Sequence, residues 1–489
     1  MMLRTRSIVS LGLLLGSFLA AWAQDQWVEV RSAHFNVLTD SGESRGRDLA
    51  LQLEQMRFLF AQTFFKDQVD QAIPLQVIGL RGEKQISEYA PLFQGKPVSV
   101  AGFYLRTQDK DYIVLDSETR QRSEALFHEY AHLLLDNNLP DAPAWFSEGF
   151  AQFCSTIQIG GKDIIVGHAP EQAAKMARTQ RLLPLSVLLN VDHNSPMYND
   201  DHSSRSLFYA QSWLAVHYFW TTHKMEAVHK YLQLTRHHTP VADAVQQAFG
   251  MSMEKLGEAL DEYSRAAMIA SRISLPEHLA QPSFSATPMM TADAAATLAD
   301  LHAHQDDYRS RSVEEFKELL ARDPDNAIAQ RGIGYALYKE HHTESALPYL
   351  RHEAQRDLRD PKDWLVHYYL SSALAQEQND SLAPEIEKES RMVTRLNPDF
   401  ADGHGLLGFA FFSQHKIAEA AIEYETALRL RPESEVYALN LAEAYTRQGR
   451  HSQARLLFDH LQNSQNWYIS TAARSHLEEQ HSAVSNQPK

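Results

Sequence analysis

The feature that most restricts the fold of this 489-residue chain is a pattern that recurs every 34 residues near the C-terminus. Residues of the same classes occupy the same offsets in two consecutive segments: Leu407, Gly408, Phe411, Ala420, Tyr424 and Ala427, then Leu441, Ala442, Tyr445, Ala454, Phe458 and Leu461. Looser copies cover residues 333–350 and 370–398, the second with about three extra residues. A period of this length predicts stacked pairs of antiparallel helices.

This pattern matches the tetratricopeptide repeat, a helix–turn–helix unit of about 34 residues. Small residues would let the two helices of a unit approach each other, and aromatic residues would fill the space towards the next unit. We therefore expect a tetratricopeptide domain over residues 299–480 and a polar tail over 481–489. Such stacks offer an extended concave surface, which predicts a protein partner.

The preceding region, residues 24–273, mixes both types of secondary structure. Alternating apolar residues predict strands at 27–30, 34–38 and 74–78, and a hairpin formed by 102–104 and 112–115. Residues 45–66 predict an amphipathic helix, and the region beyond residue 120 reads as mostly helical. Serine and proline over 274–298 predict a linker. The expected fold class is multidomain, α+β first and all-α afterwards.

The N-terminus carries an export signal. Arg4 and Arg6 precede an apolar stretch, and Ala21-Trp22-Ala23 offers a cleavage site, so residues 1–23 are predicted to be a signal peptide. The alternative is an uncleaved N-terminal anchor helix. In both cases the rest of the chain is exported, to the periplasm or outside the cell. After residue 23 no apolar run approaches the roughly 20 residues of a transmembrane helix.

Composition restricts the partners and the chemistry. The formal net charge is −16, and there is no dense run of Lys and Arg, so nucleic acid is not an expected partner. The chain has a single cysteine, Cys154. An intramolecular disulfide and a cysteine-based metal site are therefore excluded.

The motif that carries chemistry is His128-Glu129-Tyr130-Ala131-His132. No helix breaker interrupts it, and on a helix residues four apart emerge from one face, where two imidazoles can bind one Zn²⁺. Glu129 would lie beside that face and hold water rather than metal. A chain of this composition contains H-E-x-x-H by chance about one time in twelve, so the motif alone leaves open two histidines on an ordinary helix.

A zinc site needs a third protein ligand. Asp136 continues the same helical stripe but lies about 12 Å along the axis from His128, which is too far for one ion. Glu148, in a predicted second helix that begins after Pro143, is a lone acid among apolar and small residues. A buried carboxylate is costly unless it is paired or binds metal. Glu148 is therefore the candidate, and a solvent-facing glutamate is the alternative.

His128-Glu129-x-x-His132 followed by Trp145-x-x-Glu148-Gly149-x-Ala151 resembles the gluzincin metallopeptidases, and in particular the bacterial peptidase MA-like proteins, many of which carry tetratricopeptide repeats. The resemblance covers roughly residues 26–270. It implies His128, His132 and Glu148 as zinc ligands and Glu129 as the general base. It also implies Tyr209, 61 residues beyond Glu148, as the donor to the oxyanion. An aromatic packing role for Tyr209 is the alternative.

These observations predict an exported zinc metallopeptidase that takes a peptide or protein substrate. The G-x-M-E-N segment with which related aminopeptidases bind a free amine has no counterpart here, so an endopeptidase is favoured over an aminopeptidase. The repeats would bind the protein substrate or a partner. The alternative function is a non-catalytic tetratricopeptide scaffold fused to a peptidase-like domain.

Overall fold

A computed structural model describes residues 27–64, 69, 73–139, 142–192, 195, 203–280, 283–358 and 362–485. The predicted signal peptide, residues 1–23, lies outside them. The chain divides into two compact units. The first comprises Met1–Asp70, Leu75–Arg106 and Lys110–Thr291, and the second comprises Gln71–Pro74, Thr107–Asp109 and Ala292–Lys489. Within the described ranges, no helix has both the length and the apolar character needed to cross a membrane.

The first unit contains a six-stranded sheet in the order β11-β1-β2-β3-β7-β6. Its strands are β1 (Val28–Arg31), β2 (Asn36–Thr39), β3 (Leu75–Leu80), β6 (Gly102–Leu105), β7 (Asp111–Asp116) and β11 (Ser285–Pro288). β2, β3 and β7 run parallel to one another, and the other neighbours are antiparallel. The predicted strands and hairpin are confirmed, and β6 forms one edge of the sheet.

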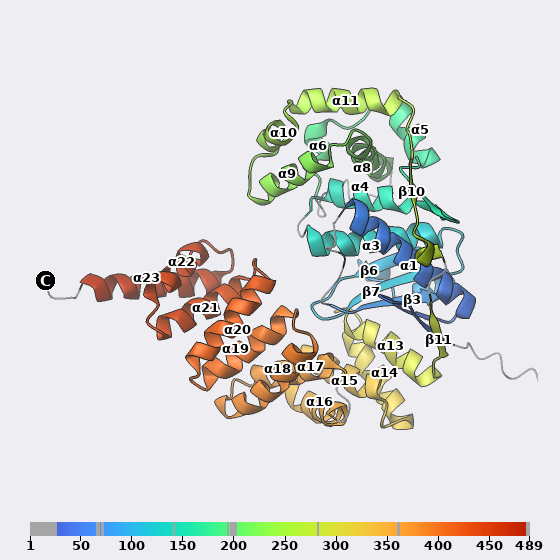
Figure 1. The fold of residues 1–489 in the computed structure, drawn as a ribbon. Helices are drawn as coiled ribbons and strands as arrows, with labels where there is room; N and C mark the ends of the chain where they lie inside the picture. Colours follow the sequence, from blue (N-terminus) through green and yellow to red (C-terminus); the bar gives the residue numbers. More distant parts are fainter. Residues whose placement is uncertain are drawn as a thin grey trace, which may run out of the picture. The chain divides into compact units, whose positions relative to one another are not determined.

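Two helices cover one face of this sheet. The helix α1 (Glu43–Thr63) matches the predicted helix 45–66, whose last two residues lie outside the described ones. Next to α1 lies α3 (Arg122–Asn138), packed over β6 and β7 (Figure 1). Leu49, Leu53 and Leu59 of α1 are fully buried in the same core as Val77 and Ile113 of the strands. This core fixes α3 against the sheet edge.

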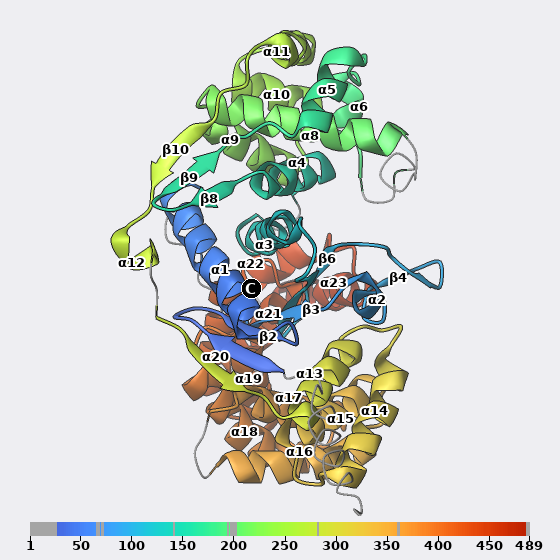
Figure 2. The ribbon, with the colours of Figure 1, turned by 90° about the vertical axis from the view of Figure 1, so that its right-hand side faces the viewer.

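The helical part of the first unit is built around α4 (Ala144–Ser155) and α8 (Ser203–Thr221), which pack against each other and above α3 (Figure 2). The remaining helices are α2 (Glu83–Ile86), α5 (Glu171–Thr179), α6 (Leu185–Leu188), α9 (Met225–Arg236), α10 (Val241–Phe249), α11 (Met253–Arg265) and α12 (Glu277–Ala280). Short strands form β4 (Leu92–Phe93) with β5 (Lys96–Pro97), and β8 (Gln158–Gly160), β9 (Asp163–Val166) and β10 (Ser271–Ser274) together. Mostly helical structure beyond residue 120 is thus confirmed.

The segment predicted as a linker, residues 274–298, has regular structure instead. Ser285–Pro288 form β11, which pairs antiparallel with β1, so this segment completes the sheet of the first unit. Helix α13 (Thr291–Ala303) begins soon afterwards. Serine and proline did not prevent a strand because β11 lies at the sheet edge and Pro288, which lacks an N–H group, stands at its end. The unit boundary at Thr291 falls inside the predicted linker.

The second unit consists of helical hairpins. Its helices after α13 are α14 (Arg309–Arg322), α15 (Ala327–Lys339), α16 (Thr343–Asp357), α17 (Trp364–Gln376), α18 (Ala383–Leu396), α19 (Ala401–Ser413), α20 (Ile417–Leu430), α21 (Glu435–Arg447), α22 (His451–Leu461) and α23 (Trp467–Ser485), with a short 3-10 turn at Asp380–Leu382. α19 and α21 begin 34 residues apart, at Ala401 and Glu435. α17 and α19 begin 37 residues apart, at Trp364 and Ala401, which accounts for the three extra residues.

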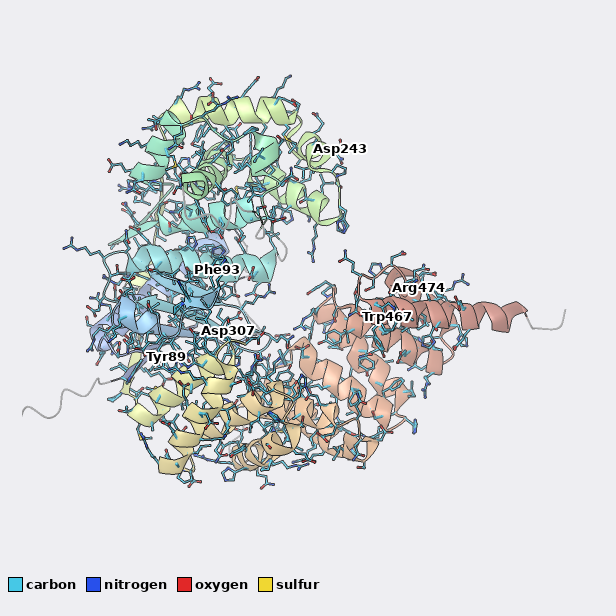
Figure 3. All side chains as sticks on the ribbon, turned by 180° about the vertical axis from the view of Figure 1, so that it is seen from behind. Tyr89, Phe93, Asp243, Asp307, Trp467 and Arg474 are labelled. Carbon is cyan, nitrogen blue, oxygen red and sulfur yellow. The ribbon has the colours of Figure 1, made fainter. Side chains whose placement is uncertain are left out.

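Small residues do lie where the two helices of a repeat meet. A Cβ atom at Gly408 of α19 would lie 2.7 Å from the ring of Tyr424 in α20, so only glycine allows this approach. The predicted polar tail, 481–489, is partly helical because no Gly or Pro interrupts α23 before Ser485, and residues 486–489 lie outside the described ones. Trp467, in the first turn of α23, is largely exposed (Figure 3).

Candidate metal centre

Helix α3 places three of the predicted residues. Leu126, Phe127, Tyr130 and Ala131 turn one face of α3 into the core, which leaves His128, Glu129 and His132 along its margin. The side chains of His128 and His132 are 22% and 18% exposed, so they are held by the protein and still reachable from solvent. Their Nε2 atoms lie 3.1 Å apart. Two imidazole nitrogens that point at each other at this distance suit a shared cation.

Helix α4 supplies the third residue. Glu148 is buried, and its Oε2 lies 3.8 Å from Nε2 of His128 and 3.8 Å from Nε2 of His132. The point equidistant from these three atoms is about 2.1 Å from each, which is the length of a zinc–nitrogen or zinc–oxygen bond. His128, His132 and Glu148 form the group that could hold a metal ion among the described residues. Two histidines and one carboxylate are a set that catalytic zinc sites use.

The surroundings of the two histidines favour their metal-binding form. Burial, together with the neighbouring His132, lowers the pKa of His128 to about 4, although Glu148 acts in the opposite direction. The imidazole is therefore neutral near pH 7, as a metal ligand must be. Nδ1 of His132 lies 3.1 Å from Oγ of Ser147. An Nδ1–H group that donates to this hydroxyl leaves the lone pair of Nε2 directed at the centre.

The position of Glu148 depends on the glycine that follows it. Gly149 lies at the crossing of α4 and α8, where a Cβ atom would stand 2.5 Å from the backbone oxygen of Ser212. No side chain fits there without a shift of helix backbone. Gly149 therefore allows α8 to pack closely on α4 and so fixes the turn of helix that carries Glu148.

Glu129 lies where a general base is expected. Its carboxyl is half-buried beside the three ligands, and burial together with the charge of Glu148 raises its pKa to about 8. A hydrogen bond from the backbone of Tyr104, in β6, acts in the opposite direction and holds the carboxyl in place. A cation bound to Glu148 would also oppose the rise in pKa.

These residues open into a cavity of about 730 Å³. Its lining includes Glu129, His132 and Glu148. It also includes Tyr104, which lies in β6, and Arg106, which directly follows β6. Asp136, which the sequence excluded as a ligand, lines the same cavity and forms an ion pair with Arg106, with 3.6 Å between Nη1 and Oδ2. The described lining thus comes from α3, from the first turns of α4, from the end of β6 and from residues 189–192.

Tyr209 lines a different cavity from the one around Glu129. It is half-buried in α8, packs against Phe208, and lines a second cavity of about 1190 Å³ that borders α3 at Phe127. The cavity around Glu129 does not have Tyr209 among its described lining residues. Its contribution to an oxyanion site stays a prediction.

The sequence alone did not indicate three residues of the site. Ser147 directly precedes the ligand Glu148, and its hydroxyl could form a hydrogen bond with a histidine. Only the structure shows that this hydroxyl contacts Nδ1 of His132. Tyr104 acts through its backbone, which leaves no trace in the side-chain pattern. Arg106 meets Asp136 across 30 residues of sequence, so no local spacing connects them.

Comparisons with known proteins concern the fold alone. A scan against protein-family models finds no match, and a search of curated proteins finds none. Among solved structures, similar ones include MamA protein (16% identity, 41% of this chain and 99% of that chain, TM-score 0.31). Others are residues 41 to the end of MamA from Desulfovibrio magneticus RS-1 (16%, 38% and 98%, 0.31) and YrrB (15%, 38% and 94%, 0.32). YrrB is described as a TPR protein with an unusual peptide-binding site.

Proposed function

We propose that this protein is a zinc-dependent peptide hydrolase. The observation that carries the proposal is the geometry of His128, His132 and Glu148, whose ligand atoms surround one point at zinc-bond length. Glu129, a carboxyl on the same helix as the two histidines, lines the cavity that includes His132 and Glu148. Ligands with an adjacent base in an accessible cavity are the arrangement of a catalytic rather than a structural zinc site.

Zinc, when bound, supplies a Lewis acid that makes water a better nucleophile and polarises a carbonyl. Glu129 would accept a proton from the attacking water on its carboxylate and deliver it to the departing amine. The backbone hydrogen bond from Tyr104 keeps that carboxylate oriented. Ser147 orients His132 through a hydrogen bond. Gly149 allows α4 to pack closely against α8 and so fixes the position of Glu148. Tyr209 is the proposed donor to the oxyanion.

Arg106 contributes a guanidinium to the cavity, where it can pair with a carboxylate on an internal residue or at the C-terminus of a substrate. An endopeptidase or carboxyl-side specificity is therefore proposed in preference to an aminopeptidase. The chain is proposed to work outside the cytoplasm, after removal of residues 1–23.

The second candidate function is that of a protein-binding scaffold. The helical hairpins from α15 to α22 repeat at 34 to 37 residues, and such arrays bind peptides and proteins on their concave surface. The solved structures named above agree with this function better than with hydrolysis. In this case the metal centre would be structural or inactive.

Replacement of Glu129 by Gln separates the two functions. The variant removes the base and leaves the three ligands, so we expect about one zinc per chain and a loss of peptide cleavage by orders of magnitude. Glu226→Gln, at an exposed position of α9, is the matched control and should cleave as the wild type does. A Glu129→Gln variant that performs the biological task as well as the wild type would refute the hydrolase and leave the scaffold.

A further inference from the structure

Arg106 stands out among the residues of the metal-site cavity. It directly follows β6, the edge strand that also contributes Tyr104. The other charged residues in the described lining are acids: Glu129, Asp136, Glu148 and Asp192. Within that described lining, Arg106 is the residue with a permanent positive charge. A single guanidinium in an otherwise acidic cavity would select among ligands by charge.

The ion pair between Arg106 and Asp136 leaves room for a further partner. Its 3.6 Å separation exceeds the roughly 2.7–2.9 Å of a strong charge-assisted hydrogen bond. The two side chains are 51% and 36% exposed, so water screens their attraction. A guanidinium carries five N–H donors, more than one carboxylate at this distance uses. Arg106 is thus held towards the cavity without being saturated.

The position of Asp136 on α3 indicates how far the ion pair with Arg106 lies from the metal centre. Asp136 lies one helical turn past His132, which is about 6 Å along the helix axis. An extended peptide advances about 3.3 Å per residue. For a peptide that runs along α3, a group that meets Arg106 therefore belongs to a residue about two positions away from the bond beside His132, the nearer ligand.

We propose that Arg106 recognises a carboxylate of the peptide substrate, about two residues from the bond that is cut. The carboxylate is either an acidic side chain or the C-terminus of the peptide, because both offer two oxygens to the guanidinium fork. Asp136 holds Arg106 in position while the subsite is empty. The inference rests on the proposed hydrolase, whose substrate class it narrows.

The test uses peptides of one sequence with Glu, Gln or Lys at each position two residues from the cut bond, each with a free or an amidated C-terminus. Binding is measured to zinc-loaded Glu129→Gln, and kcat/KM is measured with the wild type. We expect the carboxylate to improve both by about tenfold or more. Arg106→Gln should abolish this preference, Arg106→Lys should keep part of it, and Arg106→Glu should shift it towards Lys. Each Arg106 variant should keep the zinc content and melting temperature of its parent.

The outcomes distinguish an acidic side chain from the C-terminus as the source of the carboxylate. They also test the role of Arg106 separately from the proposed hydrolase. A preference for Glu over Gln assigns the side chain, and a preference for the free over the amidated end assigns the C-terminus. Cleavage that is indifferent to the carboxylate, or a preference that survives Arg106→Gln, overturns the role of Arg106 and leaves the hydrolase intact. Carboxylate-selective binding without cleavage would refute the hydrolase and support Arg106 as the recognition residue.

Discussion

Gly149→Ala is the change whose cost the structure specifies best. The new Cβ would lie 2.5 Å from the backbone oxygen and 2.7 Å from the carbonyl carbon of Ser212. An ordinary contact needs roughly 3.4 Å, so α8 or α4 must move by about 0.9 Å. Backbone cannot rotate out of the way as a side chain does. Overpacking costs about 1–3 kcal/mol, and a clash with backbone belongs at the upper end, about 3 kcal/mol, whereas replacing glycine by alanine in a helix gains about 1 kcal/mol.

The expected net effect is a loss of about 2 kcal/mol in the free energy of unfolding of the first unit. Gly257→Ala is the matched control, because Gly257 lies within α11 of the same unit and its Cβ would meet only Leu185, at 3.8 Å. This variant should gain about 0.5–1 kcal/mol. Two substitutions of identical chemistry should therefore shift stability in opposite directions.

Urea unfolding followed by tryptophan fluorescence measures both variants, since Trp145 and Trp213 are buried in the first unit. A chelator keeps metal binding out of the comparison. With a slope of about 2–3 kcal/mol per molar urea, the midpoint for Gly149→Ala should fall by roughly 0.7–1 M. Zinc affinity should fall as well, because the same shift moves Glu148. Equal midpoints for the two variants would refute the packing account of Gly149.

Two further predictions concern single side chains. Ser147→Ala should weaken zinc binding by about 10-fold or more, because His132 loses the hydroxyl that orients it. Competition with a chromophoric chelator measures the zinc affinity. An unchanged affinity would contradict the role of Ser147. In the second unit, burial lowers the pKa of His404, but hydrogen bonds to Glu423 and to the carbonyl of Pro398 outweigh it and raise the pKa. The protonated pair thus stabilises the unit fully below pH ~6.5, and this contribution is lost as the pH rises through the raised pKa. His404→Gln and Glu423→Gln should both flatten that part of the pH–stability profile, and a steep profile in either variant would contradict the assignment.

How far the sequence could predict this structure depends on whether the information was local. The i, i+4 spacing of His128 and His132 needs only a helix, and the 34-residue repeat needs only neighbouring helices, so both were predictable. Glu148 was a candidate because it is a lone acid among apolar and small residues, but its approach to the histidines joins two separate helices and follows from no local spacing. The pairing of β11 with β1 places Ser285 opposite Arg31. No local pattern in the Ser- and Pro-rich segment indicates this pairing.

The details that complete the site are also non-local. The hydrogen bond from Tyr104 to Glu129 comes from backbone, whose direction follows from the edge position of β6. Arg106 reaches Asp136 because the hairpin of β6 and β7 runs past the end of α3. The family resemblance implied that Tyr209, 61 residues beyond Glu148, shares the site, yet distance along the chain says little about which cavity a side chain lines.

We propose that His128, His132 and Glu148 hold one zinc ion. The decisive measurement is the metal content, by mass spectrometry, of zinc-replete, dialysed protein, with His128→Ala and the buried structural control His217→Gln prepared in parallel. His217 contacts the carbonyl of Gly167 and the hydroxyl of Tyr263 rather than the centre. We expect about one zinc per chain in the wild type and in His217→Gln, and none in His128→Ala. A wild type without zinc, or a His128→Ala variant that retains it, would rule out this metal centre.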